Sequence, residues 1–362
     1  MSTNPRQSST GLVMNDFQDG TQHMNSAAPS HPVQQILSRE GVALPVLTRS
    51  DLADIPVTAG DVMEAVRGAY LRVADGSSVA PPKIMMRSPY RDSAAYAMPG
   101  YDGGLQVSAF KDYYMQNDEG KKEYITITLY DDKAGVPIAF MDCTRVTTLR
   151  TAASTALIAG VCAPAGARTA LVSGSGAQGR ETFPFLLTAL PDLDRLLLFA
   201  THPDGIASVR AYLREQRPDH DVELVTDPEK AAGETDVMVA TSAGPATNVK
   251  LRTSWLKPGA LFVSVNGTGV HPSSLRDADY AVATSAGQLA VTGRRFASED
   301  GSLPLDAELP DILAGNAPSR RDKADRVFVF NSGMAITDIP VAHALATQAI
   351  ARGRGQEIRL WS

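Results

Sequence analysis

Apolar positions recur at helical spacing in one part of the chain and alternate in another. Between residues 58 and 76, Val62, Val66 and Val73 fall on one face of a helix that follows a Thr58 cap and stops at Asp75-Gly76. The stretch "EYITITLYDDKAGVPIAFMD", residues 123–142, has two β-rich arms around a glycine-containing turn and predicts an antiparallel hairpin. The first globular region is therefore expected to be α+β.

The stretch "TRVTTLRTAASTALIAGVCA", residues 144–163, is apolar nearly all round, which predicts a buried helix between two bodies. After "PAGAR", strand and helix patterns alternate from Thr169 onward, in "TALVSGSG", "QGRETFPFLLTAL", "LDRLLLFAT", "GIASVRAYLREQ", "VELVT", a helix near 227–233, "DVMVATS", "ALFVSVNG" and "YAVATS". Such units predict a parallel sheet with helices on both faces. The expected fold class is α/β, a doubly wound parallel sheet plus an α+β outer domain.

Composition narrows the class of protein. A chain of 362 residues with 43% apolar content suits two domains, and residues 1–32, rich in Ser, Asn, Gln and Pro, are expected to be a disordered tail. The net charge of −6, without a basic block, argues against nucleic-acid binding. No apolar run approaches the roughly 20 residues of a membrane span, and the amino terminus lacks a secretory core, so no membrane partner and a cytoplasmic location are expected.

The two cysteines lack a partner spacing. Cys143 and Cys162 lie in apolar surroundings, which favours reduced core thiols over a disulfide or a metal pair. No metal site is expected.

The loop "LVSGSGAQGRE", residues 171–181, brings small residues to a strand-to-helix turn. Gly174, Gly176, Ala177 and Gly179 give room for the backbone to approach a ligand, and a pyrophosphate could sit on free amides at the helix amino terminus. A glycine loop alone is weak evidence, and a tight turn without a nucleotide is the alternative. The strand before it, the helix behind it and the later βα units favour a Rossmann dinucleotide-binding domain.

The second strand of that domain ends in "LLLFATHPDG", with Ala200 where a ribose-binding acid usually stands. Without that acid a 2′-phosphate is not repelled, and Thr201 and His202 are available as donors. NADP is therefore slightly favoured and NAD stays open. Asp204, reaching back through the turn, is the alternative.

The combination of "TTLRTAASTALIAG", "GSGAQG" and "SGMAITD" resembles the ornithine cyclodeaminase and mu-crystallin family over most of the chain from about residue 40. The resemblance implies a homodimer whose outer domain forms the dimer sheet, with NAD(P) on the Rossmann domain. It implies hydride transfer between the nicotinamide and a nitrogen-bearing carbon next to a carboxylate. With it, we expect a substrate-binding and dimerisation domain at 33–150 and 320–362, and the Rossmann domain at 151–319.

The family's carboxylate-binding cations fall on Lys83, Lys111 and Arg150, which the resemblance makes catalytic and substrate-binding candidates. The family more often has arginine at the first position, and Arg87 could share the role of Lys83. Arg binds a carboxylate through a planar fork and Lys as a point charge, and a desolvated lysine could carry a proton. The alternatives are exposed lysines and, for Arg150, a structural ion pair with an acid such as Asp142.

The chain departs from the family after "ALFVSVNG". Thr268 stands where cyclodeaminases have an aspartate, and Ser274 where a further acid is common; a hydroxyl can hydrogen-bond but cannot act as a base near neutral pH. His271 could replace the acid, although a bond to a backbone carbonyl is the simpler interpretation. Asn266 and Thr268 are expected beside the nicotinamide, with Thr268 in a catalytic position.

The remaining cofactor candidates come from three segments. "NSGMAITD" matches the family's nicotinamide loop, and "VATSAG" follows a strand of the parallel sheet. Asp338 could either meet the site or complement its own helix dipole, and three methionines could line a substrate pocket or fill the core. The cofactor candidates are Gly174, Gly176, Ala177, Gln178, Thr201, His202, Thr241, Ser242, Asn266, Ser332, Gly333 and Met334, and the methionines are Met85, Met86 and Met98.

Three functions follow from these residues. The first is an NAD(P)-dependent oxidoreductase acting on an α-amino or α-imino acid, including N-substituted ones. The second is an ornithine or lysine cyclodeaminase that releases ammonia, which Thr268 puts in doubt. The third is a binding protein like mu-crystallin that holds NADPH with little turnover.

Overall fold

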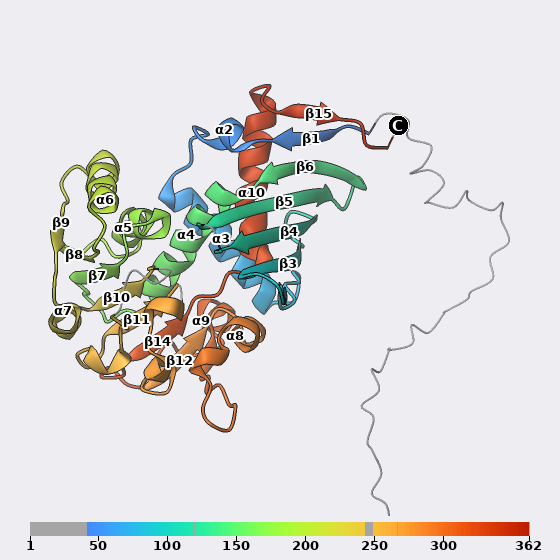
Figure 1. The fold of residues 1–362 in the computed structure, drawn as a ribbon. Coiled ribbons are helices and arrows are strands. Elements are labelled where there is room, and N and C mark those ends of the chain that lie inside the picture. The colour runs from blue at the N-terminus through green and yellow to red at the C-terminus, as the bar shows by residue number, and fades with distance from the viewer. Residues whose placement is uncertain (1–41, 119, 243–248, 266, 362) are drawn as a thin grey trace, which may run out of the picture.

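The computed structural model describes residues 42–118, 120–242, 249–265 and 267–361, arranged around two β-sheets (Figure 1). The strands are β1 (Leu44–Leu47), β2 (Ile84–Arg87), β3 (Ser93–Asp102), β4 (Val107–Gln116), β5 (Lys122–Asp131), β6 (Val136–Asp142), β7 (Thr169–Ser173), β8 (Arg195–Phe199), β9 (Val222–Leu224), β10 (Val237–Ala240), β11 (Leu261–Ser264), β12 (Tyr280–Ala283), β13 (Ala307–Glu308), β14 (Val327–Phe330) and β15 (Gln356–Ile358). The α-helices are α2 (Arg49–Leu52), α3 (Ala59–Ala74), α4 (Thr144–Cys162), α5 (Ala177–Ala189), α6 (Pro203–Gln216), α7 (Pro228–Glu234), α8 (Ala286–Thr292), α9 (Leu309–Ala314) and α10 (Ala335–Ala351).

The first sheet has the order β15-β1-β6-β5-β4-β3-β2 and is antiparallel except where β1 runs parallel to β6. The expected hairpin is present as β5 and β6, and the expected capped helix as α3, whose Thr58 side chain accepts the amide of Asp61. Side chains alternate between the two faces, so Lys111 and Met98 lie on the face that α3, α4 and α10 cover (Figure 1).

The second sheet has the order β13-β12-β14-β11-β10-β7-β8-β9, with every pairing parallel. Neighbouring residues of β7 enter different cores, Ala170 and Val172 with α5 and α6, and Leu171 with α7 and α8. The sheet is therefore doubly wound, as predicted. The order reverses between β7 and β10, which creates a crevice beyond their carboxyl ends, where such sheets bind ligands.

The strand β14 lies between β11 and β12 in the parallel sheet. It comes after the domain boundary expected at residue 320. Its four apolar residues are all buried and suit the interior of a parallel sheet that helices cover on both faces, whatever their position in the chain. The outer sheet takes its last element, β15, only after α10.

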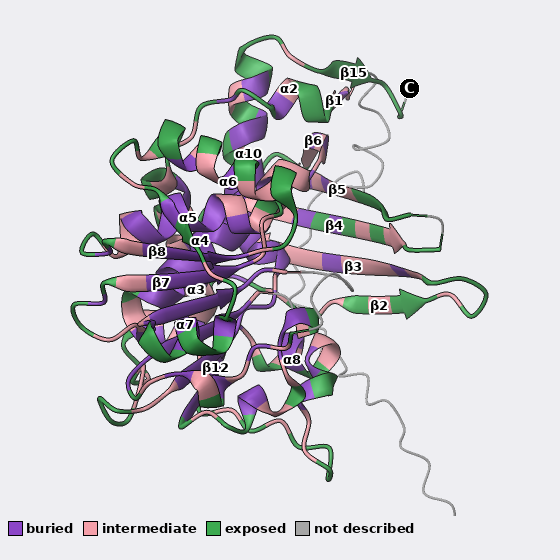
Figure 2. Ribbon diagram, turned by 60° about the vertical axis from the view of Figure 1, so that its left-hand side comes forward, coloured by how far each residue is buried: buried purple, intermediate pink, exposed green. Residues whose placement is uncertain are grey.

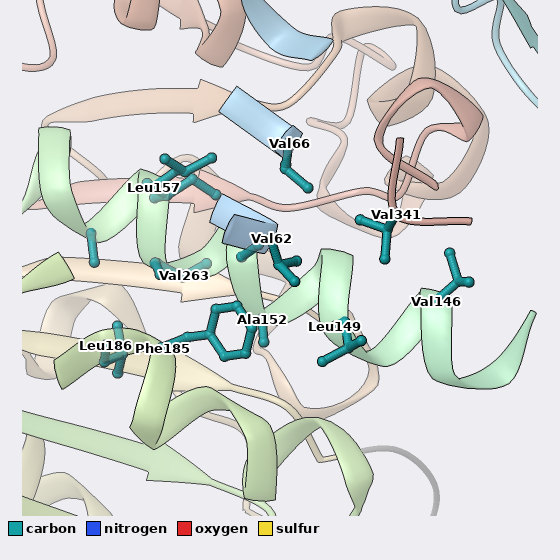
Figure 3. Packing of buried hydrophobic residues seen from close by; sticks show 14 of the residues in the cluster. Val62, Val66, Val146, Leu149, Ala152, Leu157, Phe185, Leu186, Val263 and Val341 are labelled. Atoms are coloured by element: carbon teal, nitrogen blue, oxygen red, sulfur yellow. The ribbon is translucent and has the colours of Figure 1, made fainter. Parts of the chain in front are cut away.

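Helix α4 joins the two halves of the molecule. Its small residues allow close packing on several sides, with Leu149 and Ala152 beside Val62 of α3 and Phe185 of α5 (Figure 3). Nearly every residue of its second half is buried, as the all-round apolar pattern predicted. A rigid buried helix fixes the position of any charged side chain it carries.

Burial differs between the two ends of the outer sheet (Figure 2). The strands are buried where the helices cover them and half-buried or exposed where β2, β3 and β4 project beyond the helices. Of the described helices, none is sufficiently long and apolar to cross a bilayer.

Candidate functional site

Three charged side chains meet inside the molecule at the junction of the two halves. Lys111 of β4 is 2% exposed, and its Nζ donates to Asp338 Oδ1 of α10 at 2.6 Å. Arg150 of α4 donates through Nε to the same oxygen at 3.0 Å. Asp338 is completely buried, and within the described residues its Oδ2 has no hydrogen-bond partner. One carboxylate therefore holds two cations and keeps a free acceptor.

Lys83, at the residue before β2, reaches the same region from another strand. In the strand register it continues the row of Met98 and Lys111, because Ile84 lies opposite Ala97. Its Nζ donates to Ser332 Oγ at 3.2 Å. Burial lowers the pKa of Lys83 to about 7; the positive charges of Arg150 and Lys111 act in the same direction, and Asp338 opposes them. Near neutral pH this amine can both give and take a proton.

Charges in this cluster do not cancel. Lys83, Lys111 and Arg150 against Asp338 give a formal charge of +2 when Lys83 is protonated and +1 when it is neutral. Buried charge is costly without a counter-ion, and a small carboxylate would supply one. The arrangement can therefore bind and orient an anionic group beside a proton-carrying amine.

The loop between β14 and α10 packs directly against these cations. A Cβ on Gly333 would lie 2.5 Å from both terminal nitrogens of Arg150, so a side chain there would displace the guanidinium. The Ser332 backbone is fixed by Thr284, which accepts its amide at 3.0 Å and donates to its carbonyl at 2.7 Å. Ser332 and Gly333, expected to contact the cofactor, thus contact Lys83 and Arg150.

The glycine-rich loop has the geometry that its sequence predicts. Gly174 has φ +111°, and a Cβ there would lie 2.8 Å from the amide nitrogen of Ser242, so the position requires glycine. Gly176 is the N-cap of α5 and makes no side-chain cap, and an added Cβ there would meet nothing within 4 Å. Its exposed neighbour Ala177 opens the helix. Free amides therefore face open space at a helix amino terminus, which suits a pyrophosphate.

Other cofactor candidates surround this crevice. Thr241 donates to the Ser173 carbonyl at 2.8 Å, and Ser242 accepts a bond from Thr268 Oγ1 at 3.4 Å through its own carbonyl. Gln178 donates to the Thr147 carbonyl at 3.5 Å, which connects α5 to α4 one turn before Arg150. Asn266 lies outside the described residues.

The carboxyl end of β8 carries no acid. Thr201 and His202 are both exposed there, and His202 Nδ1 accepts the Gly205 amide at 3.4 Å as the cap of α6. Asp204 is exposed in the first turn of that helix. The imidazole therefore has a local structural partner in addition to any ligand.

Several candidates do not join the cation cluster. Arg87 is exposed at the far end of β2, four residues and about 13 Å along the strand from Lys83. Met98 and Met85 lie on the face that carries Lys111, whereas Met86 is 63% exposed on the opposite face, because adjacent strand residues point in opposite directions.

Two loop residues have local partners. His271 Nδ1 accepts the Ser273 amide at 3.2 Å, so the imidazole bonds to a backbone amide and not to the backbone carbonyl that the simpler interpretation expected. Ser274 donates to the Leu251 carbonyl inside the core at 3.3 Å.

Arg150 does form a buried ion pair, as the alternative held, but its partner is Asp338, and Asp142 as the partner is wrong. Asp142 accepts a hydrogen bond from Arg49 at 3.2 Å and also bonds to Thr144. Thr144 is the first residue of α4 and precedes Arg150 by six residues. The arginine points toward Asp338, for which the sequence left both a site role and a helix role open.

Sequence reasoning also missed several polar residues around the cations. Thr147 accepts from Lys111 Nζ at 2.8 Å and lies one turn before Arg150, a spacing visible in "TTLR". Gln288 and Thr292 of α8 support Lys83 and Ser332 across separations of 205 and 40 residues, for which no local pattern exists. Among the described residues, no three His, Cys, Asp or Glu side chains gather as metal ligands would.

A doubly wound sheet with a glycine loop at its switch point lies beside a buried cluster of cations, an arrangement suited to a dinucleotide and a small acid. The chain belongs to the ornithine cyclodeaminase/mu-crystallin family, whose model matches residues 45–352.

The similarity to known relatives covers most of the chain. The chain is 26% identical over 318 residues to the nodulation efficiency protein NfeD of Rhizobium meliloti, covering 85% of this chain and 96% of that protein. It is 24% identical over 281 residues to the N-((2S)-2-amino-2-carboxyethyl)-L-glutamate dehydrogenase of Staphylococcus aureus, covering 73% and 82%. The Thermococcus litoralis Δ(1)-pyrroline-2-carboxylate reductase, solved with NADH and L-proline, has a TM-score of 0.73 at 20% identity, covering 87% and 100%. This last likeness shows a shared fold.

Proposed function

We propose that the protein is an NAD(P)-dependent oxidoreductase that interconverts an α-imino acid and the corresponding α-amino acid, N-substituted acids included. The observation that carries the proposal is the excess of positive charge formed by Lys83, Lys111 and Arg150 around Asp338. Relatives in the family include a dehydrogenase of an N-substituted glutamate and reductases of a cyclic imino acid.

Each cation has a distinct role in this proposal. Arg150 orients the substrate carboxylate through its terminal nitrogens, which Asp338 leaves free, and Lys111 adds a fixed point charge. A bound nicotinamide supplies or accepts the hydride at the nitrogen-bearing carbon. In the reductive direction Lys83 gives a proton to the substrate nitrogen as the carbon gains hydride, and in the oxidative direction it takes that proton back.

The direct test mixes the purified protein with NADH or NADPH and a panel of 2-oxo acids with amines or of cyclic imino acids. Oxidation of the reduced nicotinamide, followed by its near-ultraviolet absorbance, is the expected result. Ammonia release from L-ornithine or L-lysine in the presence of the oxidised nucleotide, without net change in the cofactor, would instead identify a cyclodeaminase. Tight nucleotide binding without turnover of any panel member would contradict the proposal and favour a binding protein.

We also propose that NADP is preferred to NAD. Support comes from the carboxyl end of β8, where Thr201 and His202 are exposed and an acid does not follow until Asp204. Calorimetric titration should give a lower Kd for NADPH than for NADH. Thr201→Asp should weaken NADPH by about tenfold more than NADH, because a carboxylate repels the 2′-phosphate; equal weakening of both would reject the preference.

A homodimer formed by the open face of the outer sheet is a further part of the proposal. Phe110, Tyr114 and Tyr124 are 55%, 41% and 64% exposed on that face, and the two tyrosine rings stack with centroids 6.5 Å apart. Exposed apolar faces of this kind are typical of subunit interfaces. Sedimentation should give a dimer that Tyr124→Glu weakens and that Tyr90→Glu, at the exposed β2–β3 turn, leaves intact; a wild-type monomer would contradict the proposal.

A cytoplasmic location is proposed from the thiols. Cys143 and Cys162 are buried and unpaired, and burial raises the pKa of Cys143 to about 11, so both suit a reducing compartment. Fractionation of the native cell should recover the protein in the cytoplasmic fraction.

A further inference from the structure

Lys83 is held mainly by the nucleotide-binding half of the molecule, although it comes from the outer sheet. The residues before it, "APP", include two prolines that cannot donate a backbone hydrogen bond. A Cβ on Gly287 would lie 2.8 Å from Pro82 Cγ, so the first turn of α8 is in close contact with this segment. The position of Lys83 therefore depends on α8.

Gln288 makes that dependence specific. Its side chain is 1% exposed; Oε1 accepts the backbone amide of Lys83 at 3.3 Å, and Nε2 donates to the Pro81 carbonyl at 3.1 Å. The backbone donor and acceptor determine which end of the amide faces each of them. One buried side chain thus fixes the backbone on both sides of Pro82.

A chain of hydroxyl groups holds the other end of Lys83. Its Nζ donates to Ser332 Oγ at 3.2 Å, Ser332 Oγ lies 3.2 Å from Thr292 Oγ1, and Thr292 donates to the Gln288 carbonyl at 2.9 Å. Because the Thr292 proton is directed to that carbonyl, Ser332 donates to Thr292 and presents a lone pair to Lys83. The chain therefore returns to the residue that holds the Lys83 backbone.

We propose that Gln288 and Thr292 are positioning residues for the proton-carrying Lys83, which they hold at its backbone and at its amine from the nucleotide-binding half. The inference rests on the proposed function, which makes Lys83 the proton carrier. Charged groups facing Lys83 are Lys111 of β4, Arg150 of α4 and Asp338 of α10. One N–H of the Lys83 amine bonds to Ser332. The other hydrogens of the protonated amine, or the lone pair of the neutral amine, are left for the substrate.

The proposal predicts the direction of a titration shift. A hydroxyl that donates one hydrogen bond accepts another more strongly, and an ammonium gains more from that acceptor than a neutral amine does. Loss of the Thr292 hydroxyl should therefore disfavour protonated Lys83 and lower its apparent pKa. The Gln288 side chain should affect geometry more than charge, and so kcat more than the pH profile.

The test measures the pH dependence of Lys83 carbamylation by cyanate, followed by peptide mass spectrometry, and the pH profile of kcat/KM. Thr292→Val should move both midpoints to lower pH by about half a unit and reduce kcat severalfold, and Thr292→Ser should restore both. Gln288→Met should reduce kcat severalfold with a smaller change in KM. A matched control is Thr188→Val. Thr188, like Thr292, donates to a carbonyl four residues earlier, that of Pro184, and bonds to one other side chain, that of Arg217.

Failure of this inference can be separated from failure of the proposed function. If no imino acid of the panel is turned over, the proposed function fails. If turnover occurs but Lys83→Met leaves the pH profile and kcat unchanged, Lys83 is not the proton carrier and the inference fails while the function stands. Lys83→Met could remove the titrating limb of the kcat/KM profile while Thr292→Val leaves the carbamylation and kcat/KM midpoints at their wild-type values. In that case only the positioning role is overturned. Failure of Thr292→Ser to restore the midpoints would overturn it as well.

Discussion

The glycine loop after β7 and the cation cluster around Asp338 form two parts of the same candidate site by opposite means. The loop offers backbone amides and empty space, and its Gly176 has room for a ligand above it. The cluster offers buried side chains from β4, α4 and α10, with the Lys83 segment beside them. A site built from backbone tolerates almost any neighbouring side chain, whereas one built from buried charges depends on each member.

This difference determines how each part should respond to substitution. Removing one charged member leaves its partner buried and uncompensated, which costs several kcal/mol. Adding a methyl group to an open backbone position changes ligand contact alone. Large effects on turnover and stability are therefore expected from the cluster, and moderate effects confined to nucleotide affinity from Gly176.

The largest effect is expected from Arg150→Met. Because Arg150 would both orient the substrate carboxylate and balance Asp338, kcat/KM should fall by about a thousandfold, or about 4 kcal/mol. Steady-state kinetics with any imino acid that the enzyme turns over gives the measurement.

Arg145→Met is the matched control for this substitution. Arg145 lies on the same helix and bonds to the carbonyls of Leu52 and Ile55, away from the cluster. It should retain most of the activity. A folded Arg150→Met variant with wild-type kcat/KM would remove Arg150 from the site.

The next largest effect is on stability. Asp338→Asn leaves Lys111 and Arg150 together without their shared carboxylate, and the free energy of unfolding should fall by about 3 kcal/mol, measured by urea denaturation. Asp102→Asn is the control, since Asp102 is equally buried and accepts from Arg72 at 2.8 Å. Both should lose stability, but only Asp338→Asn should lower kcat; an equal loss of kcat in both would show that the cluster is merely structural.

The two parts also differ in how far the sequence predicted them. The loop residues Gly174, Gly176 and Ala177 lie within four positions of one strand-to-helix pattern, so their local spacing determines the geometry. The doubly wound sheet follows from periodicity in the same way. Both were predictable because local backbone preferences determine them.

Long-range contacts explain what could not be predicted. Lys111 and Asp338 are 227 residues apart, and only the packing of α10 against the outer sheet brings them together. The Arg150–Asp142 alternative was reasonable by proximity in sequence, but the direction in which α4 presents Arg150 decides the partner. Gln288 carries no chemical signal, because an isolated glutamine on a short helix looks like a solvated residue.

A moderate effect is expected from Gly176→Ala. Since a Cβ at this position meets no protein atom within 4 Å, the free energy of unfolding should change by less than about 0.5 kcal/mol. A methyl group between the amides and a pyrophosphate should nevertheless raise the nucleotide Kd by about tenfold, or about 1.4 kcal/mol. Calorimetric titration measures the change.

Gly160→Ala, which also has room for a Cβ on the outer side of α4, should leave the Kd unchanged. Gly174→Ala should behave differently from both, because φ +111° and the nearby Ser242 make it destabilising. Wild-type affinity in Gly176→Ala would show that the loop does not hold the phosphates.

The last effect is a slope, the pH dependence of stability that Lys83 contributes, and per pH unit it is smaller than the losses above. Its pKa is about 7 in the folded protein and close to 10.5 when unfolded, so between these values the unfolded chain binds more protons. The free energy of unfolding should therefore gain a component that rises with pH from about 7 to 10, with a slope below the roughly 1.4 kcal/mol per pH unit of one whole proton. Urea denaturation across that range should show the component in the wild type and in Lys230→Met, an exposed lysine on α7, but not in Lys83→Met. Identical slopes in all three proteins would mean that the amine of Lys83 is solvated like any surface lysine, and the cluster would then lack its proton carrier.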